Sequence, residues 1–313
     1  MNPMSRNIDQ MRQDAINIFQ SGLQAVEPGM AVKNACRREG EHFFIGGLDY
    51  DLSQIDNVYV LGAGKASAPM AAAIEEFLGE RIRSGIINVK YGHLAELKYI
   101  KLVEAGHPVP DENGEQGSGE ILDLAKAAGK DDLVLCLMSG GGSALTPLPA
   151  QGLTLKDKQD TIKVLLACGA TIHEINAIRK HTSRLKGGRL AQAAHPATLI
   201  SLILSDVVGD NLDVIASGPT VPDASSFPEC MEIFNKYRII EKLPIKVVDH
   251  IRAGIEGVIS ETPTAGDAVF GRTQNLIIGS NMNAIRAAKQ KAEALGYNSI
   301  ILSSMIEGET RDV

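Results

Sequence analysis

Short apolar runs alternate with amphipathic helical patterns along most of this chain. Each run is bounded by turn residues, which is typical of a buried strand. The candidate strands are 58–61, 85–89, 100–104, 133–138, 199–204, 276–278 and 299–302. Helical patterns fill most of the gaps, at 69–78, 117–128, 155–168, 172–186 and 282–294. This alternation predicts an α/β fold: a mainly parallel, Rossmann-like sheet in three layers, with helices on both faces.

Local signals mark where several helices begin and end. Apolar residues at three- and four-residue steps predict an opening helix that ends near Pro28. Thr154 is followed three residues later by Asp157, and Thr171 by Glu174, which is the spacing of a capping box. We therefore expect helices to begin directly after Thr154 and Thr171.

The chain divides near residues 261–267, where Thr-Pro-Thr-Ala-Gly-Asp separates a helical pattern from a new strand–helix–strand unit. We assign 1–265 to a Rossmann-like domain and 266–313 to the beginning of a second, smaller α/β domain. Two strands and one helix bury too little apolar surface to be stable alone. Either the second domain is truncated, or its strands pack onto the main sheet.

Composition limits the kinds of partner. The 313 residues are 44% hydrophobic, so the chain can bury a large core. Its net charge is −7 and no block of like charge stands out, so nucleic acid is not an expected partner. No apolar stretch is long enough to span a membrane, and the polar N-terminus differs from an export signal. We expect a cytoplasmic protein that acts on a small molecule, and we leave a homodimer open.

The cysteines favour the same compartment. Cys36, Cys136, Cys168 and Cys230 are too widely spaced for a C-x-x-C metal clip, and two of them lie inside apolar runs. We expect reduced thiols in the core, as in cytosolic proteins.

The apolar run 133–138 opens directly into Ser139-Gly140-Gly141-Gly142-Ser143. Glycines allow consecutive backbone N–H groups to turn inward into a concave nest, and they leave room for a phosphate oxygen to approach. We therefore expect this loop to bind phosphate. The usual phosphate-loop sequence, G-x-x-x-x-G-K-[ST], does not occur in the chain, so an irregular turn is the alternative.

A second glycine-containing loop, Gly62-Ala63-Gly64-Lys65-Ala66-Ser67, follows the strand 58–61. It is close to the dinucleotide-binding fingerprint, but Ser67 stands where the third glycine or alanine would be. A nicotinamide enzyme also needs an acidic residue after the second strand, where this chain has Asn88-Val89-Lys90. NAD is therefore disfavoured, and NADP stays open. Lys65 can instead bring an ammonium group to a phosphate; a solvated surface lysine is the alternative.

Asp206 and His107 each follow an apolar run, at the edge of the sheet where ligands bind in parallel α/β folds. A carboxylate there is costly unless a cation or hydrogen bonds meet it. Mg²⁺ takes one or two carboxylates together with phosphate oxygens, and Asp206 and Asp210 could provide them. The alternative for Asp206 is a helix N-cap.

The predicted helix 172–186 has a polar side and continues into Gly187-Gly188-Arg189. Its expected buried stripe consists of Ile172, Ile175, Ile178 and Leu185. Opposite or beside this stripe lie Asn176, Arg179, Lys180, Ser183 and Lys186. Such a face is often simply solvated, but several cations beside two glycines suit a polyanion.

Seven segments, in this order, resemble the class II glycerate kinases, also called glycerate 2-kinases. They are Gly64-Lys65-Ala66, Ala105 to Asp111, Ser139 to Ser143, Ile178 to His181, Lys186 to Arg189, Ser205 to Val207, and Ala216 to Thr220. The resemblance implies ATP- and Mg²⁺-dependent phosphorylation of D-glycerate to 2-phosphoglycerate. It also implies a two-domain α/β fold with the active site between the domains, and a further C-terminal segment beyond residue 313.

With that resemblance, Lys65 and Asp206 are the expected catalytic residues. Lys65 would stabilise the transferring phosphoryl group or orient the glycerate hydroxyl, and Asp206 would carry Mg²⁺ or accept the hydroxyl proton. Arg179 and Lys180 would bind the glycerate carboxylate or nucleotide phosphates. The other expected substrate- or nucleotide-binding residues are Gly64, His107, Ser139, Gly140, Gly141, Gly142, Ser143, Asn176, Lys186, Gly187, Gly188, Ser217 and Gly218. The alternatives are an NAD(P)H-dependent hydroxypyruvate reductase, a label also used in this family, and an inactive nucleotide-binding fragment.

Overall fold

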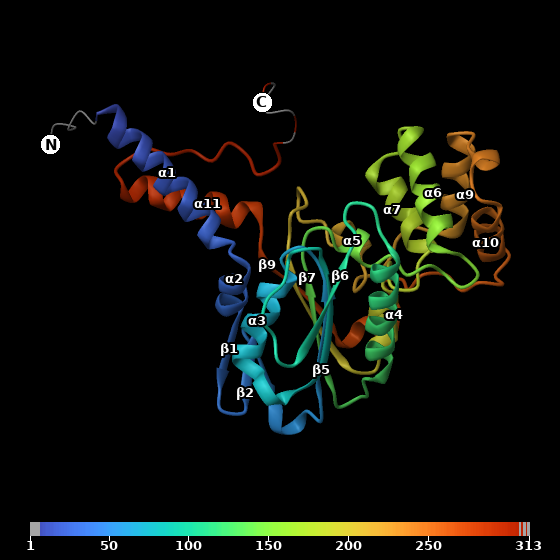
Figure 1. Cartoon of the computed structure of the whole chain (residues 1–313), viewed down its shortest axis with the longest axis horizontal. Coiled ribbons are helices and arrows are strands. Elements are labelled where there is room, and N and C mark those ends of the chain that lie inside the picture. The colour runs from blue at the N-terminus through green and yellow to red at the C-terminus, as the bar shows by residue number, and fades with distance from the viewer. Residues whose placement is uncertain (1–6, 307, 309–310, 312–313) are drawn as a thin grey trace.

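The computed structural model describes residues 7–306, 308 and 311. Its centre is a sheet of six parallel strands in the order β6-β5-β4-β7-β8-β9 (Figure 1). The strands are β4 (Val58–Ala63), β5 (Ile82–Lys90), β6 (Ile100–Ala105), β7 (Leu133–Met138), β8 (Thr198–Leu204) and β9 (Thr273–Gly279). Six of the expected strands are present in this sheet, which confirms the α/β fold.

Helices cover both faces of the sheet, as predicted. On one face pack α2 (Pro28–Ala35) and α3 (Ser67–Leu78), and on the other α4 (Glu112–Ala127) and α8 (Arg189–Ala194). The central strand β7 supplies both cores with alternate residues. Leu133, Leu135 and Leu137 join the first core, and Val134, Cys136 and Met138 join the second. A strand that is apolar on both sides is stable only between two layers of helices.

Four helices form a lobe beside the sheet, with a core of their own (Figure 1). They are α6 (Leu155–Ala167), α7 (Ile172–His181), α9 (Phe227–Lys236) and α10 (Ile245–Ile255). The predicted capping boxes at Thr154 and Thr171 are present at the starts of α6 and α7. α10 corresponds to the helical pattern expected before residues 261–267, whereas α9 lies where no element was predicted.

Further elements lie beside the β9 edge of the sheet (Figure 1). The helix α1 (Ile8–Ala25) packs along α11 (Asn281–Ala294), and Tyr297 beyond α11 donates a hydrogen bond to Asp14 at 2.8 Å. The opening helix ends before Pro28, as predicted, and Pro28 begins α2. A small antiparallel sheet that was not predicted consists of β1 (Cys36–Glu39), β2 (His42–Ile45) and β3 (Leu48–Asp51).

Two predictions of secondary structure are wrong. Residues 299–302 form no strand, and the side chains of Ile300 and Leu302 are exposed to solvent. The helix predicted over 172–186 ends at His181, because the following residues instead bond to the backbone around 148–150. The polar side of α7 is largely buried, contrary to expectation, whereas Ile172 is exposed.

The strand β9 pairs in parallel with β8 and forms one edge of the main sheet. The first strand after residue 265 therefore packs on this sheet in the structure, which was one of the two arrangements that the sequence left open. The division into domains at 1–265 and 266–313 stays a prediction.

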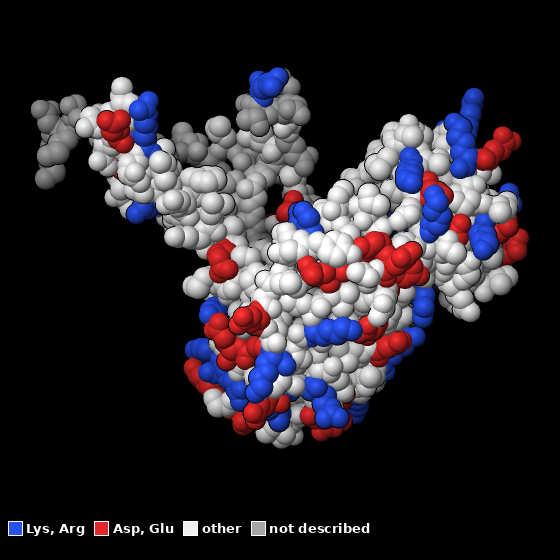
Figure 2. Space-filling model, in the orientation of Figure 1, with Lys and Arg blue, Asp and Glu red and all other residues white. Residues whose placement is uncertain are grey.

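The cysteines and the surface agree with the predictions from composition. All four cysteines are free, and Cys36, Cys136 and Cys230 are buried. Burial raises the pKa of Cys36 and of Cys136 to about 12. In the part of the chain that the structure describes, no helix combines the length and the apolar character needed to cross a membrane. On the face shown in Figure 2, Lys and Arg side chains lie among Asp and Glu side chains.

Candidate active site

Four loops meet at the carboxyl ends of the sheet strands. They follow β4, β6, β7 and β8, and three of them border a cleft of about 750 Å³ to which α7 also contributes a wall. Nine predicted site residues line this cleft: His107, Ser139, Gly140, Gly141, Gly142, Ser143, Asn176, Arg179 and Asp206. The fold therefore brings residues from both the sheet and the lobe to one place.

The nest, residues 139–143, has a geometry that only glycine allows. Gly141 has a left-handed backbone with φ of +87°, and α5 (Gly142–Leu145) begins directly after it. A Cβ on Gly140 would lie 2.0 Å from Oδ2 of Asp206, and one on Gly141 would lie 2.8 Å from the ring of His107. In the described chain, the N–H groups of Gly140 and Gly141 donate to no protein acceptor. The nest thus offers free donors to an anion.

Ser139 joins the nest to the loop that carries Lys65. Its Oγ accepts a hydrogen bond from the N–H of Ala66 at 3.0 Å. The N–H of Lys65 donates to the carbonyl of Gly140 at 2.9 Å. A Cβ on Gly64 would lie 2.0 Å from Oγ of Ser139, so a side chain there would push the two loops apart. These contacts fix the backbone of Lys65 beside the nest.

Lys65 and Asp206 face each other over the nest. The Nζ of Lys65 lies 3.9 Å from Oδ2 of Asp206, and the two side chains are 39% and 56% exposed. Attraction between such solvated groups is weak, so both stay available to a ligand. On the other side of Gly141, burial lowers the pKa of His107, and the charges of Lys65 and Lys90 lower it further. The imidazole is therefore neutral near pH 7 and can both donate and accept a hydrogen bond.

A series of hydrogen bonds follows the α7 side of the cleft. Oγ of Ser217 lies 3.0 Å from Oγ of Ser143 and donates to Oδ1 of Asn176 at 3.1 Å. The Nη1 of Arg179 donates to the same oxygen at 3.3 Å. The Nδ2 of Asn176 is buried and has no partner among the described groups. Because a buried amide donor without an acceptor is costly, an oxygen of a ligand would be stabilised here.

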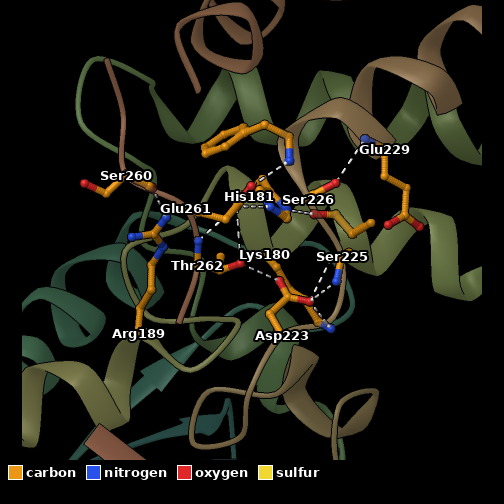
Figure 3. Close-up of polar contacts among 12 residues, drawn as sticks. Lys180, His181, Arg189, Asp223, Ser225, Ser226, Glu229, Ser260, Glu261 and Thr262 are labelled. Atoms are coloured by element: carbon orange, nitrogen blue, oxygen red, sulfur yellow. Dashed lines mark hydrogen bonds and ion pairs between the residues drawn. The ribbon is translucent and has the colours of Figure 1, made fainter. Parts of the chain in front are cut away.

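Lys180 lies outside the cleft, in a buried ion pair with Asp223 (Figure 3). Its Nζ is 3.0 Å from Oδ1 of Asp223 and 3.5 Å from Oδ2 of Asp213. Burial alone would raise the pKa of Asp223, but Lys180 and hydrogen bonds from Ser225 bring it below its ordinary value. The ammonium group of Lys180 is thus already neutralised within the chain.

Gly187 and Gly188 also bond within the chain. Their N–H groups donate to the carbonyl groups of Ser217 and Gly218, at 3.0 and 2.7 Å. They hold the turn that carries Ser217, and the contact of this hydroxyl with Asn176 links the turn to the cleft. Lys186 lies at the wall of a smaller cavity next to the cleft.

Other contacts near Lys180 join the lobe to the rest of the molecule (Figure 3). The Nε2 of His181 lies 2.6 Å from Oε1 of Glu261, whose Oε2 accepts a bond from the N–H of Phe227. Arg189 donates to the carbonyl of Ser260 at 3.2 Å. Because these bonds connect α7, α8 and the start of α9, they hold the α7 wall of the cleft in place.

Asp206 is the candidate metal ligand that faces the cleft. Asp210 follows in the same loop with φ of +54° and does not line the cleft. Over residues 7–306, 308 and 311, no three His, Cys, Asp or Glu side chains are grouped so that they could hold a metal ion. Mg²⁺ binds through one or two carboxylates together with substrate phosphates, and Asp206 fits that donor set. The role of Asp210 stays a prediction.

Lys158 is a charged residue near the cleft that the sequence prediction missed. It lies on α6, and its buried side chain borders the same small cavity as Lys186. One signal was present in the sequence, because Lys158 falls between Leu155 and Leu165 on the apolar side of an amphipathic helix. The cleft wall at Asn211, Val214 and Ile215 was also missed, and no periodic pattern marks it.

Comparisons with known proteins identify relatives of this chain. The model of a family described as a domain of unknown function, DUF4147, matches residues 14–252. The chain is 40% identical over 302 residues to the glycerate 2-kinase of Pyrococcus horikoshii, covering 96% of this chain and 67% of that protein. It is 43% identical over 254 residues to an Agrobacterium vitis protein provisionally named a hydroxypyruvate reductase, with coverage of 81% and 63%.

A solved structure shares the fold. The crystal structure of the glycerate kinase from Thermotoga maritima superimposes with a TM-score of 0.80 and 36% identity, and covers 94% of this chain and 65% of that chain. The present chain therefore spans about two thirds of the length of each of these relatives, from 63% to 67%.

Proposed function

Since the chain belongs to the glycerate 2-kinase family, we propose that it phosphorylates D-glycerate to 2-phosphoglycerate, with ATP as donor and Mg²⁺ as metal ion. The family membership supports glycerate as the acceptor. The geometry of the cleft supports phosphoryl transfer as the chemistry.

The observation that carries the proposal is the position of Lys65 and Asp206 over the nest. Phosphoryl transfer needs positioning and charge neutralisation more than covalent help, because charge spreads over the transferring group. A cation and a carboxylate lie 3.9 Å apart. Free N–H groups of Gly140 and Gly141 lie beside them. These are the parts that such a reaction requires.

We assign one task to each part. The N–H groups of the nest bind phosphate oxygens, and Lys65 neutralises charge on the transferring group. Asp206 accepts the proton of the glycerate hydroxyl or holds the metal. Arg179 and the unpaired amide of Asn176 bind oxygens of the substrates from the α7 side. ATP supplies the phosphoryl group when bound, and Mg²⁺ neutralises phosphate charge.

The first test replaces Lys65 with alanine and follows the formation of a phosphomonoester by phosphorus NMR, with ATP, Mg²⁺ and D-glycerate. We expect turnover to fall about a hundredfold to a thousandfold, because one preorganised group that stabilises developing charge has been removed. Folding should be little affected, since the side chain of Lys65 is partly exposed and its one ion pair is long.

The control is Lys33→Ala, which removes an exposed lysine from the surface ion pair with Glu76. This variant should keep wild-type turnover. Near-normal turnover in the Lys65 variant would refute the catalytic assignment. Binding of ATP without any turnover in the wild-type chain would favour a nucleotide-binding fragment instead.

A hydroxypyruvate reductase is the second candidate, because a relative that is 43% identical carries that provisional name. At the position where the ribose of a nicotinamide cofactor needs a carboxylate, β5 ends in Lys90. Asn88 is buried there and donates to the carbonyl groups of Gly114 and Leu145. Loss of NADPH absorbance with hydroxypyruvate, without a phosphomonoester signal, would favour the reductase.

We also propose a cytoplasmic location, supported by the four free cysteines. A homodimer stays a prediction, and analytical ultracentrifugation of the chain tests it.

A further inference from the structure

A side cavity of about 320 Å³ opens beside the main cleft, between the lobe and the loop after β6. The two spaces share the wall residues Pro108, Ser143, Ala144 and Arg179. Much of the remaining wall is apolar and consists of Val109, Pro110, Pro147, Ile162 and Leu166. Because so little polar surface lines it, a charge in this cavity interacts strongly with whatever lies next to it.

Four cations border this cavity. Lys163 is exposed and pairs with Asp160 at 3.5 Å, and the other three come from different parts of the chain. Lys158 comes from α6, Arg179 from α7, and Lys186 from the segment after α7. The residues Lys158 and Lys186 are only 8% and 2% exposed, and Arg179 is half-buried. Two buried positive charges and a half-buried one at one small space are costly unless a negative charge accompanies them.

The hydrogen bonds of these cations leave several donors free. The Nζ of Lys158 donates to the carbonyl of Thr182 at 2.8 Å. The Nζ of Lys186 donates to the carbonyl of Ser143 at 2.9 Å and to Oγ1 of Thr146 at 3.1 Å. Since an ammonium group has three donors, two remain on Lys158 and one on Lys186. In the described chain, none of the three cations forms an ion pair with a carboxylate.

Without a ligand, the burial and mutual repulsion of these cations lower the pKa values of both lysines. Burial, together with the charge of Arg179, lowers the pKa of Lys158 to about 7, while Glu115 opposes the shift. Burial lowers the pKa of Lys186 well below its ordinary value, and the charges of Lys158 and Arg179 contribute to this shift. An anion would reverse both shifts and lead the protein to take up protons.

We propose that this side cavity binds a phosphate group, held by Lys158, Lys186 and Arg179. A phosphate offers two negative charges and several acceptor oxygens, which match three cations and their free donors better than the single charge of a carboxylate does. This inference deepens the proposed function. Only the identity of the molecule that carries the phosphate rests on that function. Phosphate binding itself can be measured without turnover.

The test is isothermal titration calorimetry of the full chain with inorganic phosphate at pH 8, in two buffers with different heats of ionisation. We expect the wild-type protein to take up protons as phosphate binds, because Lys158 must become charged. Lys158→Met should weaken binding about tenfold to a hundredfold, the effect of losing one hydrogen bond to a charged group. It should also reduce the proton uptake.

The matched control is Lys156→Gln on the same helix, because Lys156 is exposed and pairs with Asp160 at the surface. Its phosphate affinity should equal that of the wild type. Urea unfolding reports whether each variant is folded, and Lys158→Gln serves as a second variant that keeps a polar side chain. Equal affinity in the wild type and both Lys158 variants, or binding without proton uptake, would overturn the proposal.

Titrations with other ligands identify the source of the phosphate. A loss of affinity in Lys158→Met for a non-hydrolysable ATP analogue, or for 2-phosphoglycerate, supports the proposal and names the carrier. A loss for D-glycerate alone would overturn it, because the cavity would then bind the carboxylate. If the wild type binds phosphate in a Lys158-dependent way but makes no phosphomonoester, the proposed kinase activity fails and the binding site stands.

Discussion

Two buried lysines of the lobe, Lys180 and Lys158, differ in their partners. Lys180 lies 3.0 Å from Asp223, which also accepts hydrogen bonds from Ser225 and Thr262. Lys158 has a carbonyl as its one hydrogen-bond acceptor and borders a cavity. The comparison teaches that burial of a cation does not by itself indicate a binding site. A paired cation supports the fold, whereas an unpaired one next to a cavity leaves charge for a ligand to neutralise.

The largest effect expected from this comparison is on stability. Lys180→Met should destabilise the protein by about 3–5 kcal/mol, because it leaves the carboxylate of Asp223 buried without its cation. Lys158→Met should leave stability unchanged or raise it, since the carbonyl of Thr182 keeps a bond from the N–H of Ala150. Urea unfolding of both variants measures the difference in their free energies of unfolding. Equal destabilisation would contradict the distinction between a paired and an unpaired buried lysine.

A second effect is on the pH dependence of stability. The pKa of Lys158 is about 7 in the folded protein, against 10.5 ordinarily, so between these values the unfolded chain binds more protons. Stability should therefore rise with pH above 7, by about 1.4 kcal/mol per pH unit at most, and this contribution is constant below pH 7. Urea unfolding at pH 7.5 and 8.5 should show a smaller rise for Lys158→Met than for the wild type.

The rise in stability with pH is compared between the wild type and Lys158→Met. The buried cysteines oppose this rise equally in both proteins, so their effect cancels in the difference. Parallel pH profiles would show that Lys158 stays protonated in the folded state. In that case a negatively charged group of the chain itself would have to stabilise the charged form of Lys158.

The smallest effect belongs to an exposed lysine on the same helix. Lys156 pairs with Asp160 one turn away, and both side chains are solvated. Lys156→Gln should cost only about 0.3–0.5 kcal/mol, because water and salt screen such a pair. A loss above about 1 kcal/mol in the same urea experiment would show that α6 is sensitive to any substitution, and the effects at Lys158 could then not be attributed to burial.

The parts of the fold that follow a regular period could be predicted from the sequence. The strand over 133–138 is continuously apolar because it is buried on both faces, and its bounds agree with β7. The strands β1 to β3 have four residues each and mixed polarity, so they form no apolar run. Residues 299–302 are apolar enough for a strand, but no neighbouring strand pairs with them, which a local pattern cannot reveal.

The candidate site was predictable where the topology alone decides it. Parallel strands end at one edge of a sheet, so the loops with Lys65, His107, Ser139 and Asp206 had to approach one another. The role of a charged residue on a helix depends instead on what packs against it. Lys180 had the sequence features of a binding residue, and its pairing with Asp223 required the position of a loop more than forty residues away. The residues lining the side cavity depend in the same way on tertiary packing.

The hydroxyl of Ser139, a residue of the nest, contacts the other glycine loop through the N–H of Ala66 and the hydroxyl of Ser67. The backbone of Lys65 is therefore ordered before any ligand arrives, and its conformational entropy is lost during folding and not during substrate capture. In the proposed reaction, the substrates would therefore meet Lys65 and the nest already in register. A single serine thus makes two segments of chain, separated by more than seventy residues, act as one rigid platform.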